Sequence, residues 1–179
     1  MHPIIYDVSV SLDGYISGVN GDISQFDQEG AVVDDYFDRL RSYHMAIMGR
    51  HTYEFGYGFG LKAGDNPYPN MSCHIFSSQL HLPKDSEVHA HKVLTRDAVE
   101  ALRQSASGPV YLCGGGTFAG ALLTLGLIDR LRLKIAPILL GGGVPLFASG
   151  ITPRRLKRID LKTYSSGYVY QEFSLTPQS

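Results

Sequence analysis

The chain has 179 residues, of which 44% are hydrophobic and 18% charged, and its formal net charge is −1. These values suit a single globular domain over residues 1–179, and they exclude both a disordered chain and the basic surface typical of a nucleic-acid-binding protein. The two cysteines have no metal-ligand spacing, and no apolar run is long enough to cross a membrane. We therefore expect a cytoplasmic protein without a metal site, a nucleic-acid partner or a membrane span.

Strands and helices are predicted to alternate through the first two thirds of the chain. Residues 3–10 are apolar and β-branched, which predicts a strand, and a polar loop with three glycines follows it. Apolar residues at helical spacing predict an amphipathic helix over 31–43. The other elements expected here are strands over 45–48, 73–76, 87–93 and 109–113, a long loop over 55–69, and helices over 96–105, capped by Thr95, and 117–126.

The last third of the chain contains strands only. They are expected over 131–140, 156–162 and 168–175, and the last two are expected to form a hairpin around 165–167. Alternating strands and helices followed by successive strands predict an α/β fold. Its central sheet should be mostly parallel, with an antiparallel C-terminal edge.

The stretch VYLCGGGTFAGALL, residues 110–123, joins a predicted strand to a predicted helix through three glycines. The first N–H groups of a helix have no internal partners, and glycines let a phosphate approach the backbone closely. Gly114, Gly116 and Ala119 also fit G-x-G-x-x-A, but no acidic residue ends a strand about 20 residues later, as a dinucleotide fingerprint requires. The stretch therefore favours a phosphate site, and the alternative is a tight turn without a ligand.

Two other segments place polar side chains directly after predicted strands. Arg50 follows the strand over 45–48, and Ser77 and Ser78 follow the strand over 73–76. Ligands of parallel α/β sheets collect beyond the carboxyl ends of the strands. An arginine and two hydroxyls at that edge, beside the glycine loop, would suit a phosphorylated dinucleotide.

In this order, the segments resemble the dihydrofolate reductase superfamily, and most closely the C-terminal reductase domain of the bifunctional riboflavin-biosynthesis deaminase-reductase. The matching segments are VSVSLDGYIS, IMGRHTYE, FSSQ, YLCGGGTFAGALL and APILLGGGVPLF. The resemblance covers nearly the whole chain and implies a three-layer α/β sandwich. No deaminase domain precedes this one, which argues against the full bifunctional enzyme but does not exclude a stand-alone reductase.

The resemblance also implies NADPH as the cofactor, a small heterocyclic substrate and a homodimer formed through C-terminal strands. Ile16 would cover the nicotinamide, Arg50 and its neighbours would hold the adenosine side, and the glycine loop would hold the pyrophosphate. The residues implied at the cofactor are Ile16, Gly49, Arg50, His51, Thr52, Ser77, Ser78, Cys113, Gly114, Gly115, Gly116 and Thr117.

The pattern of dihydrofolate reductases breaks on the first helix, where these enzymes carry an acid facing the substrate. Counted back from Met48, that position is Val33. Asp34 and Asp35 follow it, but a step of one residue turns a helical side chain by about 100°. If Val33 faces the pocket, neither aspartate does.

Asp7 and Asp13 are the candidate catalytic residues. Asp7 lies within an apolar strand, where burial would raise its pKa and suit a proton donor; the alternative is an ion pair or an exposed edge. Asp13 matches the acid of the riboflavin-branch loop, and it either contacts substrate or shapes the turn with Gly14. The aromatic residues Tyr53, Phe55, Tyr57 and Phe59 either line the substrate side or pack the loop.

The expected activity is hydride transfer from NADPH to a C=N or C=O carbon of a pteridine or a riboflavin-pathway pyrimidine. One alternative is a nucleotide-binding protein without catalysis. The other is a true dihydrofolate reductase in which Asp7 or Asp34 replaces the helix acid.

Overall fold

The computed structural model describes residues 1–175, and its centre is an eight-stranded sheet of order β5-β4-β3-β6-β1-β7-β10-β9. The strands of this sheet are β1 (Ile4–Ser11), β3 (Met45–Gly49), β4 (Ser72–Phe76), β5 (His89–His91), β6 (Val110–Gly114), β7 (Arg130–Ala136), β9 (Lys157–Thr163) and β10 (Val169–Ser174). A second, two-stranded sheet pairs β2 (Tyr15–Ser17) with β8 (Val144–Pro145). The helices are α1 (Ala31–Leu40), α2 (Arg50–Phe55), α3 (Arg96–Ser105) and α4 (Gly116–Thr124), with short 3-10 helices η1 (Val19–Gly21) and η2 (Gly56–Phe59).

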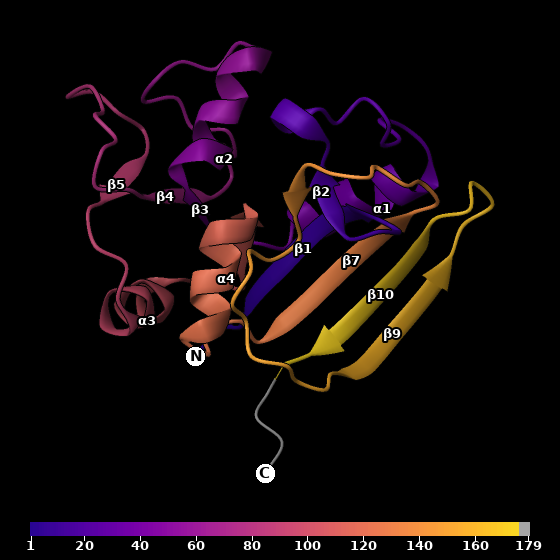
Figure 1. Cartoon of the computed structure of the whole chain (residues 1–179). Coiled ribbons are helices and arrows are strands. Elements are labelled where there is room, and N and C mark those ends of the chain that lie inside the picture. The colour runs from indigo at the N-terminus through magenta and orange to yellow at the C-terminus, as the bar shows by residue number, and fades with distance from the viewer. Residues whose placement is uncertain (176–179) are drawn as a thin grey trace.

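The pairing confirms the predicted sheet. Strands β5, β4, β3, β6, β1 and β7 are parallel to one another, whereas β10 is antiparallel to both β7 and β9. Gly167, with φ +90°, lies in the turn between β9 and β10, as expected for the hairpin. The antiparallel C-terminal edge of the sheet is therefore β10 with β9 (Figure 1).

Helices cover both faces of the sheet and give three layers. In Figure 1, α4 lies in front of the sheet and α1 lies behind it. Helix α4 is apolar on most of its surface, and Phe118, Leu122 and Leu123 are buried in the largest core cluster with Ile4 and Leu112 of the sheet. This burial stabilises the packing of α4 on the sheet, because each fully buried side chain of this size contributes about 1.5–3 kcal/mol.

The predicted elements appear in the expected order, but several differ in extent; the strand expected over 131–140, for example, ends at Ala136. Residues 55–69 were expected to form a loop. In the structure, α2 begins at Arg50 directly after β3 and ends at Phe55, and η2 follows it, so the first part of this segment is helical. The expected strand over 87–93 is reduced to the three residues of β5. The small sheet of β2 and β8 was not predicted, since β8 has only two residues and pairs across a long sequence distance.

One helix end matches the prediction and another differs from it. The Thr95 side chain accepts a hydrogen bond from the Ala98 N–H and caps α3, as predicted. Helix α1 ends at Leu40 and not at residue 43. Within residues 1–175, no helix is both long enough and apolar enough to span a bilayer.

Candidate active site

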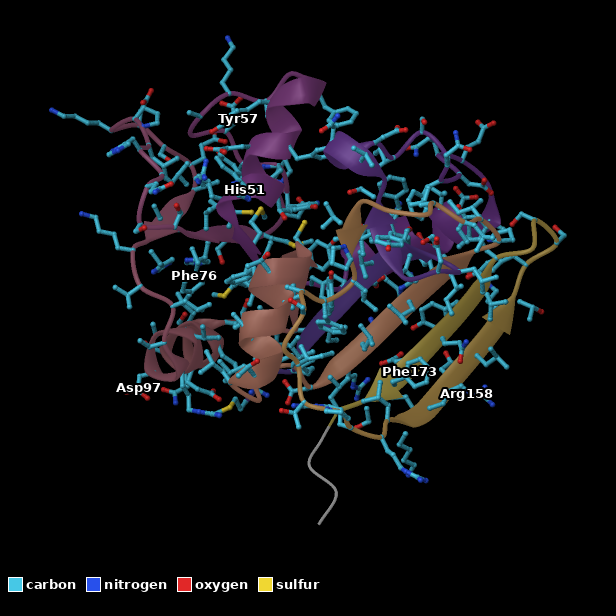
Figure 2. The ribbon with its side chains drawn as sticks, in the orientation of Figure 1. His51, Tyr57, Phe76, Asp97, Arg158 and Phe173 are labelled. Carbon is cyan, nitrogen blue, oxygen red and sulfur yellow. The ribbon has the colours of Figure 1, made fainter. Side chains whose placement is uncertain are left out.

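Two neighbouring cavities lie at the carboxyl ends of the parallel strands. The larger, which we term the glycine-loop cavity, has a volume of about 780 Å³. The predicted cofactor residues that line it are Ile16, Gly49, Arg50, His51, Thr52, Cys113, Gly115, Gly116 and Thr117. Figure 2 shows two of its lining residues, His51 and Phe76, on the side of the molecule away from Phe173 and Arg158 of the C-terminal hairpin.

The glycine loop itself is closely packed. Helix α4 begins at Gly116, and its N-cap, Gly115, has no side chain to satisfy the first N–H groups. A Cβ at Gly116 would lie 2.2 Å from the carbonyl oxygen of Pro145, and one at Gly49 would lie 3.2 Å from Phe118 Cβ. Glycine therefore lets the backbone approach its neighbours closely and leaves helix N–H groups at the cavity, which fits a phosphate group.

Arg50 and His51 add cationic and hydrogen-bonding capacity to this cavity. The Arg50 guanidinium donates to Glu54 at 2.8 Å and lies 3.0 Å from His51 Nε2. Its side chain is 30% exposed, so a phosphate would compete with Glu54 for the same donors. The donor set of Arg50, the glycine-loop amides and Thr52 fits the phosphates of a nucleotide.

Three of the predicted cofactor residues lie outside the lining of this cavity. Gly114 precedes the helix start with φ +129°, and a cis peptide joins it to Gly115. The Ser77 hydroxyl accepts hydrogen bonds from the Gln79 and Leu80 N–H groups and so shapes the turn after β4. Ser78 lies in the same turn.

The second cavity, which we term the aromatic cavity, has a volume of about 420 Å³. Five tyrosines line it: Tyr36, Tyr53, Tyr68, Tyr111 and Tyr168. The Tyr36 and Tyr111 hydroxyls are 2.7 Å apart, and the Tyr68 hydroxyl lies 3.1 Å from Cys113 Sγ. The two cavities share Val8, Ile16, Ile23, Thr52, Phe55 and Cys113, so ligands in each would meet at this common wall.

The first helix faces the aromatic cavity as its spacing predicts. Val33 lines the cavity, whereas Asp34 is exposed and the Asp35 carboxylate accepts hydrogen bonds from Lys162 and Tyr164. No carboxylate of α1 therefore lines this cavity. Asp34 does not replace the helix acid.

The aromatic residues after β3 divide between the two roles considered for them. Tyr53 and Phe55 line the aromatic cavity. Tyr57 packs on Tyr53 with ring centroids 5.6 Å apart, and Phe59 packs on Phe55 at 5.1 Å. The inner pair thus forms the wall, and the outer pair supports it.

Asp7 lies at the base of the aromatic cavity and is completely buried. The Arg39 guanidinium donates to Oδ2 at 2.9 Å, the Tyr43 hydroxyl donates to Oδ2 at 3.1 Å, and Lys134 Nζ donates to Oδ1 at 3.4 Å. Burial alone would raise the pKa of Asp7, but the charges of Lys134 and Arg39 outweigh burial and lower this pKa. The expectation of a raised pKa is wrong, because the strand carries the carboxylate into a cluster of cations.

Lys134 is the buried cation of the same cavity. It lies on β7 in register with Ser9 of β1, and its Nζ lies 3.3 Å from the centre of the Tyr36 ring. Burial lowers the pKa of Lys134 to about 8; the carboxylate of Asp7 opposes this effect and the charge of Arg39 adds to it. The cavity therefore contains a buried amine whose pKa lies below its usual range.

Asp13 lies outside the lining of both cavities. Its carboxylate accepts hydrogen bonds from the Ser11 hydroxyl at 2.6 Å and from the Leu140 and Gly141 N–H groups. These hydrogen bonds, led by that from Ser11, lower the pKa of Asp13 to about 2. In this structure Asp13 ties the loop after β1 to the loop after β7.

Sequence analysis missed Lys134 and Arg39. The strand RLRLKIA alternates cations with apolar residues, and this period-two pattern places Arg132 and Lys134 on one face. Asp7 and Ser9 alternate in the same way on β1. The missing information was the register of β1 and β7, which joins segments far apart in the sequence.

A family model for the RibD C-terminal domain matches residues 3–170. The chain belongs to the RibD C-terminal domain family. Its fold is that of the dihydrofolate reductase-like superfamily, as the sequence resemblance implied.

Individual proteins and solved structures are also similar to this RibD-type chain. Uncharacterized protein YyaP of Bacillus subtilis is 27% identical over 177 residues, which cover 93% of this chain and 91% of YyaP. Riboflavin biosynthesis protein RibD of Mycobacterium tuberculosis is 27% identical over 158 residues, which cover 79% of this chain but 44% of that protein. Among solved structures, dihydrofolate reductase from Enterococcus faecalis complexed with NADP(H) superposes with a TM-score of 0.68 at 15% identity, covering 96% of this chain and 95% of that one.

Proposed function

We propose that this protein is an NADPH-dependent reductase that transfers a hydride to a small heterocyclic or carbonyl substrate. The observation that carries the proposal is the common wall between the glycine-loop cavity and the aromatic cavity. One cavity has the donors for a phosphorylated nucleotide, and the other has the apolar, aromatic walls that suit a planar ring. Thr52, Ile16 and Cys113 stand where the two ligands would meet.

The chain's own residues would bind, align and desolvate the two reactants. A bound reduced nicotinamide supplies the hydride, and the protein sets its distance and angle to the substrate carbon. Ile16 lines both cavities and would pack against the reacting rings, while Tyr111 and Phe55 would exclude water on the substrate side.

Two relatives support this proposal. The Mycobacterium tuberculosis protein is named for riboflavin biosynthesis, and the Enterococcus faecalis enzyme is a reductase that binds NADP(H) in the same fold. Substrates of the riboflavin-pathway type, namely pyrimidines and pteridines, are therefore the first to test.

The test is titration of NADPH and of NADH into the purified protein, followed by nicotinamide fluorescence and by melting temperature. At about 100 times its dissociation constant, a ligand stabilises by about 2.7 kcal/mol. Tight NADPH binding, weakened about tenfold or more by Arg50→Ala, is the expected result. Arg96→Ala, which removes an exposed arginine outside the cavity lining, is the control. If neither nucleotide raises the melting temperature, the proposal is wrong.

NADPH consumption with pteridine and pyrimidine substrates then tests catalysis. Turnover of any of them supports a reductase. Tight NADPH binding without turnover across that panel would favour the nucleotide-binding protein without catalysis.

We also propose a homodimer formed through the C-terminal strands. Strand β9 forms one edge of the sheet, and its Ile159 and Leu161 side chains are 45% and 48% exposed. An exposed apolar edge strand is a natural site for pairing with another chain. Sedimentation at micromolar concentration should give twice the monomer mass, and Leu161→Lys should lower it; a wild-type monomer would rule the dimer out.

A further inference from the structure

The buried cation of the aromatic cavity has no role in the reaction as described so far. We infer that Lys134 is the proton donor of this site, and that its ammonium group holds a carbonyl oxygen of a planar substrate. The inference rests on the proposed reductase function and specifies the substrate class and the acid.

The position of Lys134 favours contact with a ligand. Its side chain is 6% exposed, yet it belongs to the lining of the aromatic cavity together with Tyr36 and Val33. Within residues 1–175, its Nζ has one hydrogen-bond acceptor, Asp7 Oδ1 at 3.4 Å, and it also lies over the Tyr36 ring. An ammonium group has three donors, so at least one remains for a carbonyl oxygen in the cavity.

Asp7 is the positioning residue for Lys134. Both of its oxygens already accept hydrogen bonds, and its lowered pKa keeps it ionised at neutral pH. It therefore has no proton to give. Its charge holds the amine in place and keeps Lys134 protonated in a site where burial favours the neutral form.

The other acids of the lining are less suited to donate a proton. Burial raises the pKa values of Tyr36, Tyr68 and Tyr111 far above neutral, and it also raises that of Cys113. Asp27 is exposed to solvent, in the segment between η1 and α1. An acid is most effective when its pKa lies near the working pH, and Lys134, at about 8, meets that condition.

Charged and titratable groups surround Lys134 on every side. They are Asp7 on β1, Arg39 and Tyr36 on α1, Cys113 on β6 and Tyr170 on β10. Arg39 contributes a second positive charge to the same cluster. Three cations, Lys134, Arg39 and Arg132, act on the Asp7 carboxylate, and Arg132 also pairs with Glu172. The base of the cavity therefore favours a substrate oxygen and disfavours a protonated, cationic ring.

The proton transfer is balanced as follows. The hydride from the reduced nicotinamide adds to the carbonyl carbon or to a carbon conjugated with it, and the nicotinamide is oxidised. The displaced π electron pair comes to rest on the carbonyl oxygen, which takes one proton from Lys134 Nζ. Lys134 is left neutral and regains a proton from solvent before the next turnover.

The test compares two bicyclic rings of matched shape, quinazoline-2,4-dione and 2,4-diaminoquinazoline, titrated into the protein with and without NADP⁺. The dione presents carbonyl oxygens and is neutral, whereas the diamine is protonated near neutral pH. We expect the wild type to bind the dione about tenfold or more tightly than the diamine, which corresponds to about 1.4 kcal/mol. Binding of the dione should weaken as pH rises through about 8, because the neutral amine loses its charge.

Two variants separate proton donation from a structural role. Lys134→Met should reduce the preference for the dione to within about threefold, with NADPH affinity unchanged. Lys134→Arg should keep the preference and remove its dependence on pH near 8, because arginine stays protonated. With any substrate that turns over, Lys134→Arg should lower kcat strongly, because arginine keeps its proton and cannot donate it. A structural role alone would lower the melting temperature of both variants without changing the ring preference.

The inference is overturned if neither ring binds with a dissociation constant below about 1 mM, or if Lys134→Met keeps the wild-type preference. It is also overturned if Lys134→Arg turns over a substrate as fast as the wild type does. These results are independent of the NADPH titration. A protein that binds NADPH but shows no ring preference would retain the proposed function and lose this inference.

Discussion

The glycine-loop cavity and the aromatic cavity share a wall but are built in different ways. The first uses backbone amides and short segments that directly follow strands, so its lining includes Gly115, Gly116 and Arg50. The second gathers side chains from distant parts of the chain, including Asp7, Tyr111 and Lys134. A site made of backbone is visible in the sequence as a motif, whereas a site made of side chains depends on strand register.

The difference also concerns charge. In the glycine-loop cavity, Arg50 is partly exposed and its partner Glu54 is one helical turn away. In the aromatic cavity, the ion pairs of Asp7 are buried and link β1, α1 and β7. Removing one partner of a buried pair should therefore affect folding far more than removing an exposed one.

The largest expected effect is that of Asp7→Asn. This change leaves Arg39 and Lys134 without their buried anion, and it should lower the free energy of unfolding by about 3–5 kcal/mol. Asp38→Asn, which breaks the exposed pair with Arg41, should cost about 0–1 kcal/mol and is the control. Urea denaturation measures both changes.

Asp7 lines only the aromatic cavity, so the folded fraction of Asp7→Asn should still bind NADPH with nearly the wild-type affinity. Equal urea midpoints for Asp7→Asn and the wild type would contradict the conclusion that the buried ion pairs of Asp7 stabilise the fold. A large loss of NADPH affinity in Asp7→Asn would contradict the conclusion that Asp7 contributes to the aromatic cavity and not to the glycine-loop cavity.

Gly116→Ala should have an intermediate effect, on the other cavity. The added Cβ would lie 2.2 Å from the Pro145 carbonyl oxygen, so the start of α4 or β8 must move. We expect a loss of about 1–3 kcal/mol of stability and weaker NADPH binding, measured by melting and by fluorescence titration.

Gly142→Ala is the matched control, because nothing lies within 4 Å of a Cβ at Gly142. It should leave both stability and NADPH affinity close to the wild type. If Gly116→Ala behaved like this control, the close packing of the glycine loop would be refuted.

The smallest effect is expected for Asp13→Asn, at an acid outside the lining of both cavities. The pKa of Asp13 is lowered in the folded protein to about 2, so its stabilising effect is present above about pH 4 and is lost as pH falls through about 2. Asp13→Asn should therefore melt at a lower temperature than the wild type near pH 6, and the difference should shrink in acid. NADPH and dione affinities should not change; if dione affinity fell sharply, Asp13 would be a substrate contact.

The sequence allowed prediction of most of the fold and about half of the candidate site. Several elements have signals within a few residues of sequence. Thr95 is a helix cap, the helix over 31–43 has apolar residues at helical spacing, and the C-terminal hairpin has a glycine-containing turn. The residues implied around Arg50 and Gly115 also follow local segments, and most of them line one cavity. In contrast, the ionisation state of Asp7 depends on Lys134, which lies 127 positions away in the chain. No local pattern could show that the burial of this carboxylate would be compensated.

The segment around β8 is hydrogen-bonded to three parts of the molecule that lie far apart in the sequence. The Leu146 N–H donates to the Gly14 carbonyl oxygen, the Ala148 N–H donates to the Gly116 carbonyl oxygen, and the Tyr6 hydroxyl donates to the Leu146 carbonyl oxygen. The loop after β1 is thereby fastened to the start of α4 through a short stretch that belongs to neither. A substitution in this stretch would shift both the loop after β1 and the start of α4. Directed evolution could therefore change nucleotide affinity and substrate affinity with a single substitution here.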